Sequence, residues 1–291
     1  MSDVSVRRGP ARGGAGAHRG SGAPPRVAAA SAHAGRRPLA RSLRDAAIGV
    51  AGLVCAIALW WAATHGLAGP QSPVRLFAPE RALESAPALL RDERLAMHVR
   101  MSVVRVATGL GIALALGVPL GLLIGRVRWL DALLSPTFQF LRMISPLSWM
   151  PLAVMSFGIG ERSICFLLAF AAFWPILMST ASGVGQVDRR WLELGESLAA
   201  TRAELAWHVV LPAITASVLS GARLAIGVQW IVLVPAEMLG VSAGLGYLVL
   251  DTRDRLAYSE LAAVIVVIGA IGLALDALAR AALARWTKAR A

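Results

Sequence analysis

The chain has 291 residues, of which 57% are hydrophobic and only 16% are charged, and its formal net charge is +12. A soluble domain of this length carries charge on about a quarter of its residues, so the composition argues against an ordinary globular domain. The arginines lie in an N-terminal tail and between long apolar runs, which fits membrane topology better than nucleic-acid binding, and we expect no nucleic-acid partner.

The first 98 residues contain three predicted segments. Residues 1–44 are rich in Gly, Ala, Arg, Ser and Pro, a composition that predicts a disordered basic cytoplasmic tail. Residues 45–70 follow as the first transmembrane helix, because about 20 apolar residues without charge can span a bilayer. Residues 71–98 are interrupted by prolines and carry balanced charge, which predicts a periplasmic segment with a short surface helix over about 79–95.

Residues 99–285 are predicted to form the core of an all-α membrane bundle, so that the whole chain has about six transmembrane helices. The five further spans are expected at about 106–125, 130–157, 164–184, 213–235 and 261–283. The second span contains closely spaced glycines, which allow helices to approach each other in lipid. These are Gly109, Gly111, Gly117, Gly121 and Gly125.

The third span is interrupted by Pro146 and Pro151, so we expect it to be broken or kinked. Six spans place both termini on the same side of the membrane. Basic residues concentrate on that side, while the charges on the opposite side nearly cancel. The basic residues lie in the tail, in the loops after the second and fourth spans, and in and just before the C-terminal segment 286–291, at Arg280, Arg285, Lys288 and Arg290. The positive-inside rule therefore places both termini and the loop 185–212 in the cytoplasm.

The loop 185–212 is long for a turn between two spans, and it has helical character. Leu194, Leu198, Leu205 and Val209 are spaced for one apolar side of a helix. The dipeptide at residues 211–212, Leu-Pro, then begins the next span, since proline suits the first turn of a helix.

This loop resembles the EAA loop of binding-protein-dependent ABC importers. The pattern of that loop is Glu-Ala-Ala, three residues, Gly, nine residues, Ile, one residue and Leu-Pro. Aligned on Leu211 and Pro212, the sequence has Glu193 for the acid and Val209 for the isoleucine. It departs from the pattern at the two alanines, where Leu194 and Gly195 stand, and at the glycine, where Ala199 stands.

Two further blocks are more specific than the loop. Residues 141–161, LRMISPLSWMPLAVMSFGIGE, and residues 221–260 resemble the third and fifth spans of the sulfonate, nitrate and taurine permease group. The similarity covers roughly residues 95–285 and implies a type I importer permease in the bacterial inner membrane. It also implies transport of a small solute, of which aliphatic sulfonate, nitrate and taurine are the candidates.

In this family the loop forms a short coupling helix that contacts a separate ATPase. The resemblance assigns this role to Glu193, Gly195, Ala199, Arg202, Glu204, Val209, Leu211 and Pro212. The alternative is an ordinary amphipathic surface helix. The resemblance further implies ABC ATPase subunits, a periplasmic substrate-binding protein, a second copy of the permease in a homodimer, and the lipid bilayer as partners.

Lys288 is the only lysine, and no glycine-rich loop precedes it. A P-loop needs such a lysine to hold the nucleotide phosphates, so we expect ATP and Mg to bind to the partner ATPase and not to this chain. We also expect no metal site and no catalytic residue, because the permease is not itself an enzyme.

Polar residues within the predicted spans are candidates for the substrate path. Arg142 and Arg223 fall near the middle of two spans, where a charge is costly and usually faces the bundle interior or water. An anion path would favour them. Alternatively, they pair with backbone carbonyls, Glu237 or Asp276 and only hold the helices together. The further candidates are Ser145, Pro146, Trp149, Gln229 and Glu237.

Two other classes of function compete with the importer. A secondary transporter or channel would work without ATP, but it predicts inverted repeats or a chain of acidic residues through the spans, and neither is present in the sequence. A membrane scaffold without transport fits the glycine-rich second span and the long loop only weakly.

Overall fold

The computed structural model describes residues 39–66, 69 and 72–288. Contacts divide the chain into two units, Met1–Val54 and Cys55–Ala291. Helix α1 (Leu39–Gly66) runs across this boundary. Most of the tail predicted for residues 1–44 lies outside the described residues, but residues 39–44 are helical, so the prediction of disorder was wrong for them.

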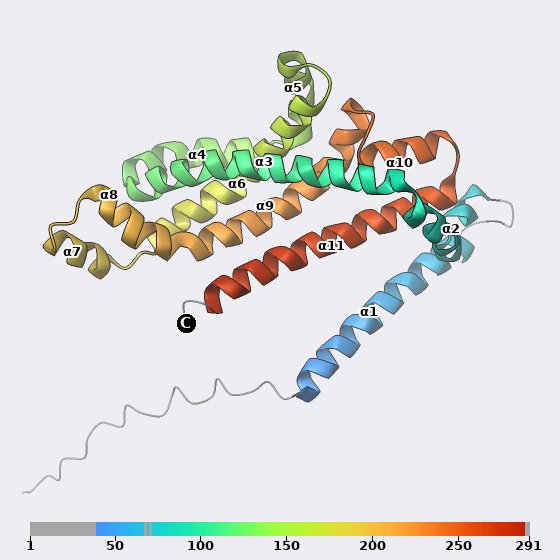
Figure 1. Ribbon diagram of the computed structural model, residues 1–291, viewed down its shortest axis with the longest axis horizontal. Coiled ribbons are helices and arrows are strands. Elements are labelled where there is room, and N and C mark those ends of the chain that lie inside the picture. The colour runs from blue at the N-terminus through green and yellow to red at the C-terminus, as the bar shows by residue number, and fades with distance from the viewer. Residues whose placement is uncertain (1–38, 67–68, 70–71, 289–291) are drawn as a thin grey trace, which may run out of the picture. The chain divides into compact units, whose positions relative to one another are not determined.

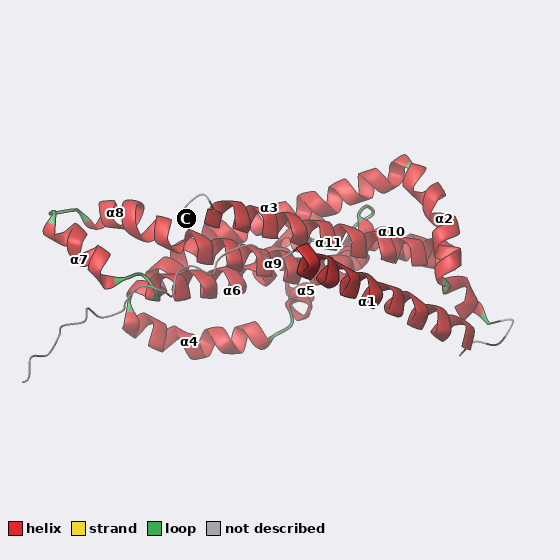
Figure 2. Ribbon diagram, turned by 90° about the horizontal axis from the view of Figure 1, so that it is seen from below, coloured by secondary structure: helices red, strands yellow, loops and turns green. Residues whose placement is uncertain are grey.

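The described residues are helical and contain no strand, which confirms the predicted fold class (Figure 2). The elements after α1 are η1 (Pro73–Phe77), α2 (Pro79–Arg91), α3 (Glu93–Arg126), α4 (Arg128–Met143), η2 (Pro146–Trp149), α5 (Met150–Phe157), α6 (Glu161–Gly185), α7 (Arg189–Ser197), α8 (Arg202–Leu205), the π-helical turn η3 (Ala206–Val210), α9 (Leu211–Gly240), α10 (Leu245–Asp254) and α11 (Tyr258–Lys288). In the described chain five helices are long and apolar enough to cross a membrane, and a bent pair, α4 with η2 and α5, makes a sixth if it is one span.

Helices α3, α6 and α9 pack side by side at the centre of the second unit (Figure 1). Ile164, Leu167 and Leu168 of α6 are completely buried there, together with Leu233 of α9. Helix α11 lies along α9, while α2 and α10 pack against α11 near its N-terminal end (Figure 1). The loop between α6 and α9, which contains α7 and α8, lies at the opposite end of these helices.

Four of the five glycines of α3 lie in the contact with α6, as the sequence predicted. A side-chain carbon added to Gly121 would lie 2.7 Å from Cβ of Thr180 and 2.8 Å from the carbonyl oxygen of Leu177. Gly109, Gly117 and Gly125 are similarly crowded by α6, whereas Gly111 has nothing within 4 Å. The absence of side chains therefore lets the two backbones approach closely.

We expect Gly121→Val to destabilise the protein by about 1–3 kcal/mol, because α3 and α6 must separate to admit the new methyl groups. The matched control is Gly111→Val on the same helix, which should change stability much less, since its side has open space. Thermal unfolding of the purified chain in detergent, followed by circular dichroism, measures both. Equal effects of the two substitutions would contradict the close helix contact.

The third predicted span is sharply bent, as the proline at position 146 predicted. Helices α4 and α5 meet at an angle of 88° across the segment that contains Ser145 and Pro146. A residue before proline is pushed out of the helical region, and Ser145 is accordingly extended, with φ −57° and ψ 131°. Pro151 lies in the first turn of α5, where a proline is tolerated, so it does not cause the break.

Two other elements differ from the prediction. The second span was expected to begin at residue 106, but α3 begins at Glu93 and brings Arg105 into the helix. The outer loop after the fifth span contains helix α10, and its residues Leu245, Gly246 and Leu248 are buried. The predicted surface helix over 79–95 corresponds to α2.

Candidate functional site

The loop that we expect to contact the ATPase folds into two short helices separated by a tight turn. Helix α7 ends at Ser197, and α8 begins at Arg202 after Thr201 caps it. The hydroxyl of Thr201 accepts a hydrogen bond from the backbone N–H of Glu204, and a carboxylate oxygen of Glu204 accepts one from the N–H of Thr201 at 2.7 Å. This capping box fixes the start of α8, which continues through η3 into α9.

Ala199, in the turn, has a left-handed backbone conformation with φ +56°. The N–H of Ala200 donates to the carbonyl of Gly195 at 3.0 Å and closes the end of α7. A left-handed residue at this position after a helix is usually glycine, because any side chain there is strained. The EAA pattern has glycine at this position, so the geometry gives a physical reason for that glycine.

We therefore expect Ala199→Gly to stabilise the turn by about 1 kcal/mol. Hydrogen exchange of the amides of Leu198 and Ala200 should slow by about fivefold, which is the factor that this free energy corresponds to. The control is Ala200→Gly, one residue further on. Ala200 is not one of the described residues with a positive φ, so glycine at this position should speed exchange. Faster exchange in Ala199→Gly would contradict the strain.

The apolar residues of the loop do not form the single stripe that the sequence predicted. Leu205 is buried and packs against Gly195, at which an added side-chain carbon would collide with Leu205 Cδ2. Leu194 and Leu198 instead point outward, with 50% and 75% of their surface exposed, and Trp191 beside them is 61% exposed. The loop thus presents an apolar surface made of Trp191, Leu194 and Leu198, which we call the loop patch.

The other predicted coupling residues lie around the loop patch and in the following turns. Glu193 is exposed and forms an ion pair with Arg189 at 3.1 Å, one helical turn away. Arg202 is exposed, Glu204 is engaged in the capping box, and Val209 is half-buried. Leu211 and Pro212 form the first turn of α9, as predicted.

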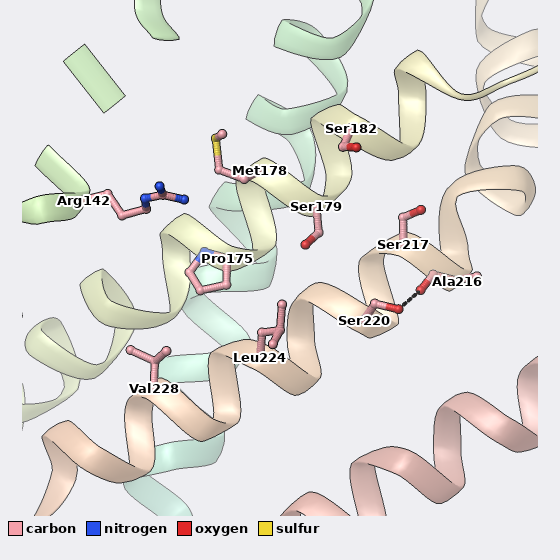
Figure 3. Close-up of a pocket in the computed structure, with 10 residues that line it drawn as sticks. All are labelled: Arg142, Pro175, Met178, Ser179, Ser182, Ala216, Ser217, Ser220, Leu224 and Val228. Atoms are coloured by element: carbon pink, nitrogen blue, oxygen red, sulfur yellow. Dashed lines mark hydrogen bonds between the residues drawn. The ribbon is translucent and has the colours of Figure 1, made fainter. Parts of the chain in front are cut away.

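Arg142, one of the residues proposed for the substrate path, lines a groove. This groove lies between α6 and α9, has a volume of about 750 Å³ and is open to the surface (Figure 3). Its lining residues are Arg142, Pro175, Met178, Ser179, Ser182, Ala216, Ser217, Ser220, Leu224 and Val228. Ser145, Pro146 and Trp149 belong to the bend after α4, and the Trp149 ring packs 5.3 Å from that of Phe170.

Arg223 and Gln229 make structural contacts instead. Arg223 Nε donates to Asp276 on α11 at 2.8 Å, and Asp276 also pairs with Arg280 at 2.5 Å. This is the alternative in which an intramembrane arginine holds two helices together. Gln229 is fully buried and donates to the carbonyl of Leu168 at 3.1 Å.

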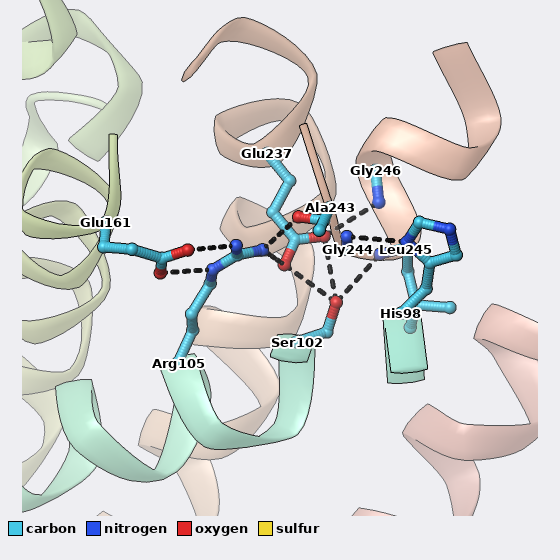
Figure 4. Close-up of polar contacts among 9 residues, drawn as sticks. All are labelled: His98, Ser102, Arg105, Glu161, Glu237, Ala243, Gly244, Leu245 and Gly246. Carbon is cyan, nitrogen blue, oxygen red and sulfur yellow. Dashed lines mark hydrogen bonds and ion pairs between the residues drawn. The ribbon is translucent and has the colours of Figure 1, made fainter. Parts of the chain in front are cut away.

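Glu237 is buried and lies in a network of charged and polar groups that joins α3, α6, α9 and α10 (Figure 4), in which Glu161 alone has an exposed side chain. Its carboxylate accepts hydrogen bonds from Arg105 Nη1 at 2.5 Å, from the Ser102 hydroxyl at 2.8 Å and from the N–H of Gly246 at 2.8 Å. Arg105 also pairs with Glu161 at the start of α6 through two nitrogens.

The same network positions the backbone just before α10. Arg105 donates to the carbonyl of Ala243 at 2.7 Å, and His98 Nδ1 accepts from the N–H of Gly244 at 3.0 Å. Gly244 has φ +128°, and a side chain there would collide with Glu237. We call the set of His98, Ser102, Arg105, Glu161 and Glu237 the α3–α10 network.

The sequence prediction missed Arg105 and the serines of the groove. Arg105 stands directly before the apolar run that predicts the second span. Because that run is defined by the absence of charge, it excludes Arg105. The signal that could have found it is the helical spacing of Ser102 and Arg105, which places both on one face. The serines recur at three-residue spacing on two helices, but the sequence alone does not show that these two faces lie opposite each other.

Three relatives illustrate the similarity to known proteins. A bicarbonate transport permease from Synechococcus elongatus is 35% identical over 81% of this chain and 87% of its own length. The taurine transport permease of Escherichia coli is 33% identical over 87% of this chain and 92% of its own length. A putative aliphatic sulfonate permease from Bacillus subtilis is 32% identical, over 76% and 79% of the two chains.

The fold and the site together define a multi-pass helical membrane protein with an apolar loop patch at one end and, between two spans, a groove that contains four serines and Arg142. The family described as the inner membrane component of binding-protein-dependent transport systems matches residues 117–288. The chain belongs to this family and is a permease subunit of an ABC importer. Membership implies an ATPase and a solute-binding protein as its partners.

Proposed function

We propose that this permease imports a small oxyanion and that the loop patch and the residues around it receive the ATPase. The solutes named for its relatives are bicarbonate, taurine, nitrate and aliphatic sulfonates. Each of these solutes contains a compact oxyanion group. The shared chemistry of these relatives is the observation that carries the substrate class.

The loop patch supports the coupling role. Trp191, Leu194 and Leu198 are exposed next to one another on α7 and the following turn. A group of exposed large apolar side chains is typical of a site that binds another protein. Glu193 and Arg202 are charged and exposed close by, as in the polar rim of a protein interface. The predicted coupling residues are thus placed around a surface suited to a protein partner.

The remaining roles are proposed from the resemblance to the family. ATP and Mg bind to the ATPase, this chain performs no catalysis, and a second copy of the permease completes the transport path as a homodimer. The loop patch and both termini face the cytoplasm of a bacterial cell across its inner membrane. The positive-inside distribution of arginine supports this orientation.

The test is ATP hydrolysis by the reconstituted complex. The full chain is placed in nanodiscs with its partner ATPase, and its partner binding protein is added with bicarbonate, nitrate, taurine or methanesulfonate. We expect hydrolysis to rise only when the binding protein and its preferred anion are both present. Failure of every anion to stimulate hydrolysis would overturn the proposal, and uptake without the ATPase would favour a secondary transporter or channel.

A further inference from the structure

The groove between α6 and α9 is lined by hydroxyl groups from both helices. Ser179 and Ser182 lie on one face of α6, and Ser217 and Ser220 lie on the facing side of α9 (Figure 3). The spacing of three residues on each helix places the two serines of a pair on the same side. The groove occupies the half of both spans that is nearer to the α7–α8 loop.

Close packing explains why two of these residues are small, but it does not explain why they are serines. A side-chain carbon on Gly183 would lie 2.7 Å from Ser217 Cβ, and one on Gly221 would lie 2.7 Å from Ser179 Cβ. Alanine would fit the same contacts without placing a polar group in an apolar span. A hydroxyl in such surroundings is unfavourable unless it has a hydrogen-bond partner.

The usual partner of an intrahelical serine is the carbonyl four residues earlier. Ser220 has this bond, to Ala216 at 2.8 Å, and Ser182 accepts from Gln186 at 3.1 Å. The hydroxyls of Ser179 and Ser217 form no hydrogen bond within the described part of the chain. Their hydroxyls are therefore free to donate to a molecule in the groove.

Arg142 contributes the charge of the groove, and its pairing differs from that of Arg105 and Arg223. Arg105 is paired with two carboxylates and Arg223 with one. Arg142 forms no ion pair with any described residue, and the groove lining contains no Asp or Glu. An unpaired cation within a span attracts either water or an anion.

We propose that this groove is the anion-binding part of the transport path, in which Arg142 supplies the positive charge and Ser179 and Ser217 donate hydrogen bonds to a small oxyanion. This inference rests on the proposed function, because it assumes that an oxyanion crosses the protein. It goes further by assigning the contacts to particular residues of α4, α6 and α9.

The proposal predicts that a thiol in the groove reacts preferentially with anions. In a full-length chain in nanodiscs with Cys55→Ala and Cys165→Ala, Ser220→Cys is treated with sulfonatoethyl methanethiosulfonate or with its trimethylammonium analogue. We expect the ratio of anionic to cationic reaction rates, normalised to a free thiol, to exceed one. Arg142→Gln should lower it by about fivefold, as loss of one nearby charge in a water-accessible groove implies.

Controls separate this effect from folding and from general accessibility. Leu116 on α3 is 55% exposed and lies outside the groove, so the ratio for Leu116→Cys should not respond to Arg142→Gln. Ser182→Cys is a second, more exposed groove position for which the same fivefold change is expected. Elution as a single species in size-exclusion chromatography establishes that each variant is folded. Methanesulfonate should also slow the reaction of Ser220→Cys more than equal chloride does.

The outcomes distinguish this proposal from the proposed function, because thiol modification needs neither the ATPase nor the binding protein. A ratio that Arg142→Gln leaves unchanged at both groove positions, or no reaction at either, would overturn the anion groove even if hydrolysis is stimulated. A ratio that falls as expected, together with a complex that no loaded binding protein stimulates, would support the groove and overturn the importer.

Discussion

Replacing Arg105 by leucine is expected to lower the free energy of unfolding by about 3–5 kcal/mol, the cost of breaking a buried ion pair on one side. Arg105 and Glu237 have 2% and 0% of their side chains exposed, so water cannot replace the lost partner. The carboxylate of Glu237 would keep only its bonds to Ser102 and Gly246. Thermal and SDS-induced unfolding of the full chain, followed by circular dichroism, measures the loss.

A double variant tests whether the charge or the packing matters. Arg105→Leu with Glu237→Leu removes both buried charges, and replacement of a buried pair by apolar residues is often close to neutral. We expect the double variant to be more stable than Arg105→Leu alone, although the N–H of Gly246 then loses its acceptor. Arg253→Leu breaks an exposed pair with Asp254 and should cost no more than about 1 kcal/mol. An Arg105→Leu protein that is as stable as the wild type would contradict the network.

The α3–α10 network also explains why four separate elements meet at this end of the molecule. Ser102 and Arg105 come from α3, Glu161 from α6 and Glu237 from α9, and the backbone before α10 supplies the remaining partners. Each buried polar group is satisfied by a group from a different helix, so the helices cannot slide past one another without leaving a charge unpaired. The network therefore fixes the relative positions of these helices more strictly than apolar contacts alone do.

The membrane-spanning helices could be predicted well because hydropathy is a local property of the sequence. The glycine contacts of α3 could also be anticipated, since small residues at helical spacing typically mark a close contact between membrane helices. The break near Pro146 followed from proline geometry. Its angle of 88° did not, because the direction of a bend depends on what both halves pack against.

The polar contacts could not be predicted, because they depend on pairs that are far apart in the chain. Arg223 had Glu237 and Asp276 as equally plausible partners in the sequence, and only the packing of α9 against α11 selects Asp276. Glu237 was assigned to the substrate path, yet it is occupied by Arg105 and Ser102. A sequence shows which residues are unusual in a span but not which of them face each other.

In the loop 185–212, helical spacing predicted one apolar side, which the structure does not form. Helical spacing placed Leu194, Leu198, Leu205 and Val209 on one side, which assumed an unbroken helix. The left-handed residue Ala199 interrupts that helix, so Leu205 turns inward against Gly195 while Leu198 turns outward. One strained residue thus separates Leu205, which is buried, from Leu198, which is exposed.

The second large effect is expected at this surface. Trp191→Ala should weaken binding of the ATPase by about 2 kcal/mol, or about 30-fold in Kd, because exposed tryptophans are typical anchors of protein interfaces. Leu198→Ala should weaken it by about fivefold, which corresponds to about 1 kcal/mol, since it removes less apolar surface. Titration of labelled ATPase onto the permease in nanodiscs measures both constants.

Leu256→Ala is the matched control for these variants. Leu256 is 66% exposed, close to the 61% of Trp191, but it follows α10 at the other end of the second unit. Its substitution should leave the Kd unchanged, and none of the three residues is buried, so their loss should not unfold the chain. If Trp191→Ala and Leu256→Ala bind the ATPase equally well, then the ATPase does not contact the loop patch. Since Ala199 directs Leu198 outward, the same titration on Ala199→Gly would show whether binding depends on the shape of this turn or only on its apolar residues.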